Sequence, residues 1–131
     1  MLKPGDLIRY NYLWAREAAR GEESGRKARP SCVVVRTPAK PSVLFVFPLT
    51  SQQPGSERAF LAVPEIECRR GGLDYPSFLI LDEYNRFFED EAFDLEVPKP
   101  IGAFSGPFLR TIAATVRERA QSRRLNAVTR R

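Results

Sequence analysis

The sequence predicts one domain that is mainly β with a C-terminal helix, built on a small, strongly curved antiparallel sheet or a partly open β-barrel. A chain of 131 residues with 43% hydrophobic content can bury one core. Short apolar segments separated by turn residues fill most of the chain, which is typical of such a sheet. After Ser105 the apolar residues instead recur at helical spacing. We expect residues 1–124 to form the domain and the basic segment 125–131, which lacks apolar periodicity, to fray.

The expected strands are short, apolar or alternating, and bounded by turn-forming residues. Pro48 has no N–H to donate to a sheet, so it marks a bulge or an edge and leaves Thr50 at the end of its strand. Residues 13–20 allow a helical turn. Gly21 and Gly25 then bracket a polar loop, which is either a solvated connection or a lid. The strand segments are 7–12, 31–36, 42–49, 60–63, 66–68 and 77–81.

The final helix has recognisable start signals. Ser105 or Gly106 can cap it, and Pro107 suits its first turn because a proline there loses no helical hydrogen bond. Its apolar face should pack on the sheet as far as about Val116. The residues at helical spacing are Phe108, Leu109, Ile112, Val116 and Ala120.

The formal net charge of +5 is unevenly distributed along the chain. Residues 1–58 carry net +5, residues 59–116 carry net −5, and residues 117–131, with six arginines, carry net +5. The first basic region contains Arg29 and Thr50. A polyanion is therefore a plausible partner at that part of the chain.

The chain contains no histidine, which restricts the chemistry that it can perform. A Ser-His-Asp hydrolase, a Cys-His protease, a paired-histidine ribonuclease and a histidine-ligated zinc site are all excluded. Cys32 and Cys68 lie in strand-like surroundings without CxxC spacing, so we expect reduced core residues and not a disulfide or a metal site. No metal and no cofactor is expected.

No apolar run approaches the roughly 20 residues that a membrane span requires. The N-terminal residues also lack an apolar stretch of the signal-peptide type. We therefore expect a cytoplasmic protein with no membrane partner.

Two linked segments carry the strongest functional signal. Residues 25–30 run directly into the apolar strand 31–35, and the strand beginning at residue 44 ends in Thr50 and Ser51. Arg29 precedes a proline, which favours an extended backbone, so two strands could deliver Arg29 and Thr50 to one surface. The alternatives are a strand-end arginine paired to a carboxylate and a turn-forming threonine hydroxyl.

Together with the opening segment 3–10, Lys-Pro-Gly-Asp-Leu-Ile-Arg-Tyr, the order of these motifs resembles the MazF/PemK family of toxin endoribonucleases. In that family a Gly-Asp strand, a Gly-x-Arg-Pro segment and a strand ending in a Thr-Ser-like pair follow in this order. The resemblance includes residues 78–83 and 101–105 and spans 3–118. It implies a PemK/MazF/CcdB-type fold and a growth-inhibiting mRNA interferase, a metal-independent endoribonuclease. It also implies a homodimer and an acidic antitoxin protein as partner.

The resemblance also suggests roles for individual residues. Arg29 would stabilise the phosphoryl charge while the substrate's 2′-OH attacks, and Thr50 would hold the phosphate in line. The candidate bases are Glu22, Glu23 and Asp82. The expected substrate is single-stranded RNA, because sequence reading of RNA usually requires unpaired bases. The catalytic candidates are Arg29, Thr50, Glu23 and Asp82, and the RNA-binding candidates are Arg26, Lys27, Ser51, Gln52, Gln53 and Arg86.

The chain departs from the family pattern at two places. Gly25 and Arg29 are further apart than the family's Gly-x-Arg-Pro spacing, which displaces Glu22 and Glu23 and leaves the general base open. Arg86 stands in place of an arginine-rich segment, where it could contact phosphate or neutralise the acidic residues 89–91.

Two alternative functions fit the same sequence. One is a non-catalytic relative that binds a protein, as the CcdB toxins do when they trap DNA gyrase. The other is a nucleic-acid-binding domain that uses the arginine-rich tail. For either toxin type we expect a homodimer, because the apolar residues near the first strand exceed what one small domain readily covers. These residues are Tyr10, Tyr12, Leu13 and Trp14.

Overall fold

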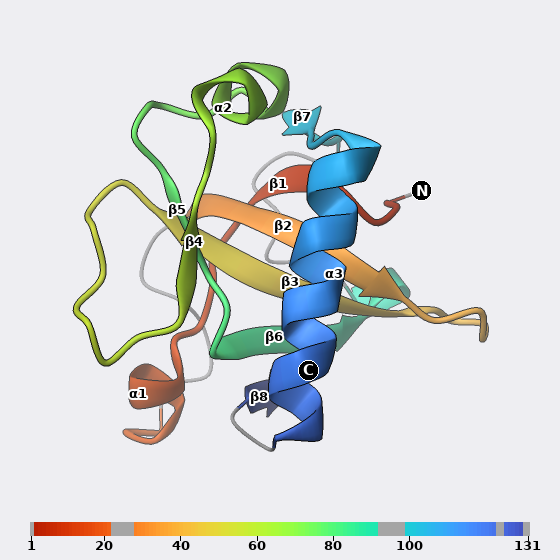
Figure 1. Ribbon diagram of the computed structural model, residues 1–131. Helices are drawn as coiled ribbons and strands as arrows, with labels where there is room; N and C mark the ends of the chain where they lie inside the picture. Colours follow the sequence, from red (N-terminus) through yellow and green to blue (C-terminus); the bar gives the residue numbers. More distant parts are fainter. Residues whose placement is uncertain (1, 22–27, 92–98, 123–124, 130–131) are drawn as a thin grey trace.

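The computed structural model describes residues 2–21, 28–91, 99–122 and 125–129. It shows a curled, mainly antiparallel half-barrel sheet with a C-terminal helix lying across one face (Figure 1). The expected fold class is thus confirmed at this level. The strands are β1 Asp6–Tyr10, β2 Arg29–Arg36, β3 Val43–Thr50, β4 Phe60–Ala62, β5 Phe78–Ile80, β6 Glu83–Phe88, β7 Gly102–Ala103 and β8 Asn126–Thr129. The helices are α1 Ala15–Ala18, α2 Glu65–Gly71, the 3-10 turn η1 Glu89–Glu91 and α3 Gly106–Gln121.

Strand β3 is the centre of the sheet because it belongs to three ladders. Its antiparallel pairing with β2 spans most of its length, from Leu44 to Pro48. Along its other side it pairs with β6 near its start and with β5 at its end. The main path through the sheet runs β4-β5-β3-β2-β1-β7, and β6 continues to β8. The sheet therefore divides where β3 passes from β6 to β5, and this division leaves the end of β3 beside the β4–β5 arm (Figure 1).

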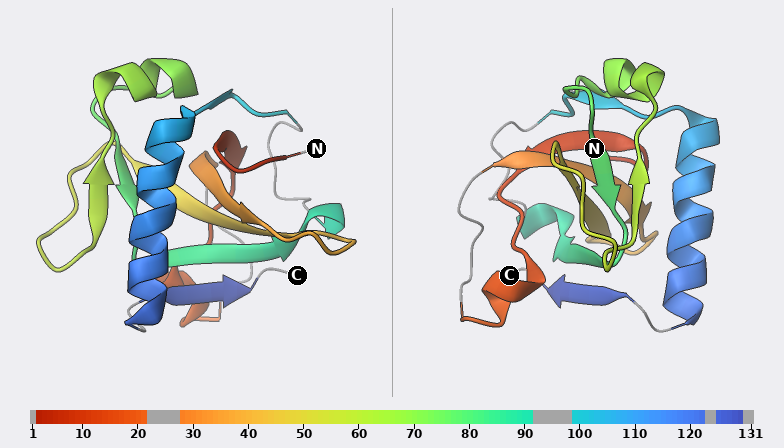
Figure 2. Two further views of the ribbon diagram at one scale, coloured as in Figure 1. Left: turned by 45° about the vertical axis from the view of Figure 1, so that its right-hand side comes forward. Right: turned by 60° about the vertical axis from the view of Figure 1, so that its left-hand side comes forward.

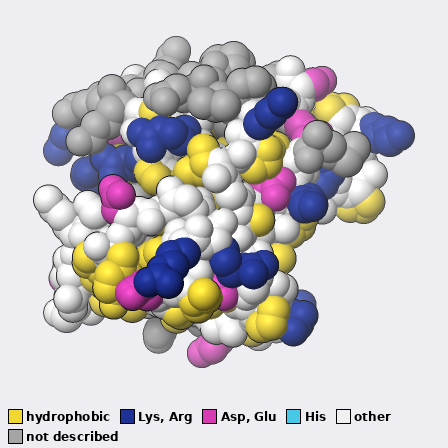
Figure 3. Space-filling view, turned by 90° about the horizontal axis from the view of Figure 1, so that it is seen from above, with side chains coloured by type: hydrophobic (Ala, Val, Ile, Leu, Met, Phe, Trp, Pro, Cys, Tyr) yellow, Lys and Arg dark blue, Asp and Glu magenta, His cyan; other side chains and the backbone are white. Residues whose placement is uncertain are grey.

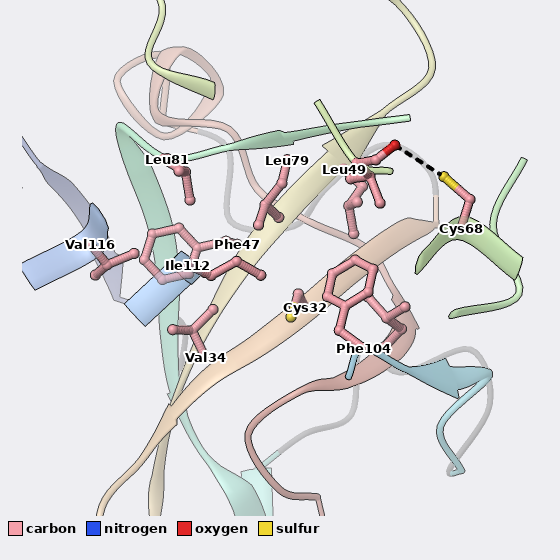
Figure 4. Packing of buried hydrophobic residues seen from close by; sticks show 12 residues of the cluster. Cys32, Val34, Phe47, Leu49, Cys68, Leu79, Leu81, Phe104, Ile112 and Val116 are labelled. Carbon is pink, nitrogen blue, oxygen red and sulfur yellow. Dashed lines mark hydrogen bonds between the residues drawn. The ribbon is translucent and has the colours of Figure 1, made fainter. Parts of the chain in front are cut away.

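Both faces of the sheet are buried at its centre, which explains why the central strands β2 and β3 are largely apolar. In β2, Cys32 and Val34 belong to one core cluster and Val33 to the other, because successive side chains point to opposite faces. The first cluster lies under α3, where Ile112 and Val116 face the sheet (Figure 4). The second cluster lies on the opposite face and includes Tyr10, Tyr12 and Trp14 along with aliphatic residues of β2 and β3.

Helix α3 follows its sequence signals closely. Ser105 is the N-cap, and its Oγ accepts a hydrogen bond from the Phe108 N–H at 3.3 Å. The buried carboxylate of Glu67 on α2 accepts bonds from the Ser105 N–H at 2.9 Å and from its hydroxyl at 2.7 Å. These bonds fix the start of α3 against α2, so the apolar face with Ile112 packs over the sheet.

The segment expected as a strand at 66–68 is instead part of α2. Acidic residues occupy the first turn of this helix, and basic residues occupy its last turn, as the helix dipole favours. Gly72 ends it in the left-handed conformation, with φ of 69°. The alternation of Ile66 and Cys68 resembled a strand, but these capping and charge signals determine the local structure.

The C-terminal segment does not fray over residues 126–129, contrary to expectation. These residues form β8, which pairs in parallel with β6 from Glu83↔Asn126 to Arg86↔Thr129 (Figure 2). An open edge of β6 supplies backbone hydrogen-bonding groups, so even a segment with little apolar content gains a partner there. The remaining tail residues, 130–131, lie outside the described part of the chain.

The apolar residues near the first strand are buried within the chain, which removes the surface argument for a dimer. Tyr10 and Tyr12 are 1% exposed, Leu13 is 3% and Trp14 is 7%. The two cysteines are free and buried, as expected. Among the described residues, no helix has both the length and the hydropathy needed to cross a membrane.

Candidate active site

Strands β2 and β3 bring Arg29 and Thr50 together. The printed pairing of the two strands reaches Ser31↔Pro48, so Arg29 and Thr50 lie just beyond its end, at neighbouring ends of β2 and β3. Both residues line one surface groove with a volume of about 670 Å³, called here the groove. Its walls come from β1, the 14–16 segment, the start of β2, the end of β3, the end of β5 and two loops. The lining residues are Arg9, Trp14, Arg16, 28–30, 49–55, 57–58, 73–74, 77 and 80.

The charge of the groove is predominantly positive. Among the described residues, four arginines line it, against two carboxylates. By contrast, the face of the molecule at the α2 end carries basic, acidic and hydrophobic side chains next to one another (Figure 3). Arginines therefore outnumber carboxylates in the lining of the groove, which favours the binding of an anion. The arginines are Arg9, Arg16, Arg29 and Arg58, and the carboxylates are Glu57 and Asp74.

Arg29 is half-buried, and no carboxylate of the described residues forms a salt bridge with it. Partial burial lowers the pKa of its guanidinium from the ordinary value, the positive charge of Arg16 lowers it further, and Glu17 opposes the shift. The group stays protonated at neutral pH because an arginine pKa begins far above 7. Among the described residues, the carboxylate partner that the sequence also allowed for Arg29 is not present.

Thr50 is half-exposed at the end of β3, and its hydroxyl shapes the turn that follows. Its Oγ1 accepts a hydrogen bond from the Gln52 N–H at 3.2 Å. The turn role weighed from the sequence is therefore present. It is compatible with a second role, because a hydroxyl that accepts one bond can still donate its own hydrogen into the groove. The same turn carries the exposed residues Ser51, Gln52 and Gln53 along the groove wall.

The other sequence candidates lie apart from this arrangement. The Asp82 carboxylate is held by Arg58, which donates from Nε at 2.8 Å and from Nη2 at 2.6 Å. Asp82 does not line the groove, so it serves to hold Arg58, which does. Arg86 on β6 donates from Nη2 to the Thr129 hydroxyl on β8 at 2.8 Å and also lies outside the groove. The candidates Glu22, Glu23, Arg26 and Lys27 fall outside the described residues.

Four groove residues were missed by the sequence reasoning. They are Arg9, Trp14, Arg16 and Arg58. The Cζ atoms of Arg16 and Arg58, together with that of the predicted Arg29, lie 4.9, 5.9 and 5.2 Å from the Trp14 ring centroid. Arg9 on β1 lies opposite Pro30, beside Arg29. The pairing of β1 with β2 could have identified Arg9 from its strand position, whereas no local pattern places Trp14, Arg16 and Arg58 at the groove.

Behind the groove, β6 contributes a buried carboxylate. Glu83 Oε1 accepts from the Tyr12 hydroxyl and from the Ala15 N–H, both at 3.1 Å, and Oε2 lies 3.4 Å from Arg58 Nη2. Burial raises the pKa of Glu83 above its ordinary value of 4.5, although the Ala15 N–H, Arg58 and the Tyr12 hydroxyl oppose the shift and Asp82 adds to it. Ionised Glu83 therefore costs stability relative to the neutral form.

This burial predicts a specific pH dependence. Below the unfolded-state pKa, Glu83 is protonated in both states and contributes no penalty. As the pH rises from about 4.5 through the higher folded-state pKa, the unfolded state loses its proton first, so the penalty grows and then stays constant. We expect the unfolding free energy of the protein to fall, relative to Glu83→Gln, across that interval. Urea unfolding of both proteins from pH 4 to 8 measures the difference, and a difference independent of pH would contradict the assignment.

Within the described residues no group of three His, Cys, Asp or Glu side chains could hold a metal ion. The site chemistry of the groove consists of guanidinium donors, one strand-end hydroxyl, amide side chains and two carboxylates. Such a set can bind phosphates, stabilise charge on a phosphoryl group and accept a proton. The sequence matches no protein-family model, and it shows no significant similarity to a curated protein.

Proposed function

We propose that the protein is a metal-independent endoribonuclease that cleaves single-stranded RNA, acting as the toxin of a toxin–antitoxin pair. The observation that carries the proposal is that Arg29 and Thr50 line the same arginine-lined groove. Support for the toxin role comes from the motif order shared with MazF/PemK toxins. An acidic antitoxin would be attracted by the same cations that attract phosphate.

The proposed reaction uses the substrate's own 2′-hydroxyl as nucleophile. The 2′ oxygen forms a bond to phosphorus and the bond to the 5′ oxygen breaks, which leaves a 2′,3′-cyclic phosphate and a 5′-hydroxyl. Arg29 donates hydrogen bonds to the phosphoryl oxygens as their charge increases, and Thr50 donates one that orients the phosphate. The proton of the 2′-hydroxyl passes to a carboxylate, and water protonates the leaving oxygen.

Among the described residues, Glu57 and Asp74 are the carboxylates that line the groove, so they are the proposed proton acceptors alongside Glu22 and Glu23. Asp82 is no longer favoured for this role, because its two oxygens are occupied by Arg58. Base contacts fall to the exposed amides of Gln52 and Gln53, which follow Thr50 along the groove wall. A homodimer remains part of the proposal through the resemblance to paired toxins.

The experiment that tests the function is cleavage in excess EDTA. The purified protein is expected to cut single-stranded RNA, to leave DNA of the same sequence intact because it has no 2′-hydroxyl, and to yield the cyclic phosphate. The products are resolved by gel electrophoresis and mass spectrometry. RNA carrying 2′-O-methyl groups is the matched control and should bind without being cut. Loss of cleavage in EDTA, or cutting of DNA, would reject the mechanism.

A further inference from the structure

Three of the groove arginines have their guanidinium groups near the ring of Trp14. Arg58 has a separate anchor in its two bonds to Asp82, so its orientation does not depend on the indole. Arg16 and Arg29 differ from it. Within the described residues neither forms a hydrogen bond or an ion pair with another side chain, and each guanidinium lies over the Trp14 ring. The indole is thus the structural partner that these two cations share.

An aromatic partner has a consequence that a carboxylate partner would not have. A carboxylate would take up guanidinium N–H donors and cancel the charge, which would weaken both groups as phosphate ligands. The face of an indole attracts a cation through its quadrupole and leaves the charge in place. Arg16 and Arg29 lie over the same ring and carry like charges, so they repel each other. Burial lowers the pKa of Arg29 most, the charge of Arg16 lowers it further, and Glu17 opposes both. The indole face attracts both guanidiniums and, together with the charge of Glu17 near Arg29, offsets this repulsion.

The ring itself is held firmly by the backbone on either side of it. Leu13 donates its N–H to Asn85 Oδ1 at 2.9 Å, and its carbonyl accepts from Asn85 Nδ2 at 2.7 Å. Ala15 donates its N–H to Glu83. Trp14 donates its own N–H to Glu17 Oε1 at 3.1 Å, and its ring packs edge-on against Tyr12 at 5.1 Å between centroids. The indole is thus fixed in place before any ligand arrives.

We propose that Trp14 is the positioning residue of the groove, whose indole holds Arg16 and Arg29 with their N–H donors available to the phosphates of a single-stranded nucleic acid. The inference rests on the proposed function for its choice of ligand but does not require cleavage. Removing the aromatic face should let the two cations separate, so the protein would neutralise fewer phosphates. A smaller aromatic ring at this position should preserve most of the binding to the nucleic acid.

The test measures binding of a 2′-O-methyl RNA oligonucleotide, which cannot be cleaved, to three folded proteins at several salt concentrations. The first is the unmodified protein. The second is Trp14→Leu, which keeps an apolar side chain but has no aromatic ring. The third is Trp14→Phe, which keeps a smaller aromatic ring. We expect Trp14→Leu to weaken binding roughly tenfold, in line with the removal of cation–π attraction. The slope of log K against log salt should also decrease by about 0.7 for each phosphate that is no longer neutralised. Trp14→Phe should recover most of both values.

A purely structural role for Trp14 would lower thermal stability without changing the salt slope of the folded protein. The inference is overturned if folded Trp14→Leu keeps the wild-type slope and affinity, or if Trp14→Phe is as defective as Trp14→Leu. Binding of the oligonucleotide without cleavage of ordinary RNA would reject the enzyme and leave this inference standing. RNA cleavage that is unchanged in folded Trp14→Leu would reject this inference and leave the proposed enzyme standing.

A second measurement applies if Trp14→Leu does not fold. Trp14 is the sole tryptophan of the chain, so the fluorescence of the unmodified protein reports directly on this site. Oligonucleotide binding is expected to change its emission, and Arg16→Gln, which removes one of the cations, should reduce the salt slope and diminish that change. Arg69→Gln on α2, an exposed arginine outside the groove, is the matched control and should do neither. An Arg16→Gln protein that is indistinguishable from the control would overturn the proposal.

Discussion

Replacing Arg29 with alanine is expected to reduce RNA cleavage by roughly a hundred- to a thousandfold, the effect typical of removing one transition-state donor. The charge on the phosphoryl oxygens is greatest in the transition state, so the guanidinium contributes more to kcat than to substrate binding. Single-turnover cleavage and binding of 2′-O-methyl RNA measure the two effects separately. Binding should weaken far less, because Arg9, Arg16 and Arg58 remain in the groove.

The matched control for Arg29→Ala is Arg69→Ala. Arg69 is an exposed arginine on α2 whose partner is Glu65, one helical turn away, and it does not line the groove. Both substitutions remove one positive charge, so a general electrostatic effect on RNA attraction would appear in both. Equal losses of activity in the two variants, or undiminished cleavage by folded Arg29→Ala, would show that Arg29 has no special role.

Replacing Asn85 with alanine is expected to lower the free energy of unfolding by about 2 to 4 kcal/mol, since a buried polar group left without a partner costs about 1–3 kcal/mol. Asn85 is fully buried on β6, and its amide satisfies both the N–H and the carbonyl of Leu13. The variant leaves both backbone groups unpaired. Denaturant unfolding measures the change, and the backbone that carries Trp14 should become less ordered at the same time.

Gln53→Ala provides the comparison for Asn85→Ala. It also removes a side-chain amide, but Gln53 is exposed, so the free energy of unfolding should change by no more than about 0.5 kcal/mol. A similarly small change for Asn85→Ala would mean that the Leu13 backbone finds other partners and that the groove wall is not fixed from β6.

The sequence predicted the fold best where the strands are apolar and bounded by turn residues. Strands β1 to β3 and helix α3 were identified because their side chains follow the periods of a buried strand and a capped helix. Strand β6 was missed because its inward-facing residues include Glu83 and Asn85, which are buried at 5% and 0% exposure. A strand that buries polar groups to bind a distant loop lacks the apolar pattern that sequence analysis detects.

The candidate site was predicted only where its residues lie on strands that have a recognisable apolar pattern. Arg29 and Thr50 stand at the ends of recognisable strands, so their presence in one groove was predictable from the antiparallel pairing of β2 with β3. Trp14 and Arg16 enter through a segment whose path is set by hydrogen bonds to β6, which no local pattern reveals. Asp82 could be recognised as an acidic residue at a strand end, but its partner Arg58 comes from a loop 24 residues away.

The bonds that hold Trp14 also bear on the order in which the molecule is assembled. They join residues 71 and 72 positions apart, Tyr12 with Glu83 and Leu13 with Asn85, whereas β2 and β3 are neighbours in the chain. Bringing distant segments together requires closing a long loop, which slows folding. During synthesis the β2–β3 hairpin can thus form as soon as it leaves the ribosome. Trp14 takes its final position only after residues 83–85 have been synthesised. A nascent chain therefore acquires Arg29 and Thr50 early and completes the surface around them only after residues 83–85 have been made.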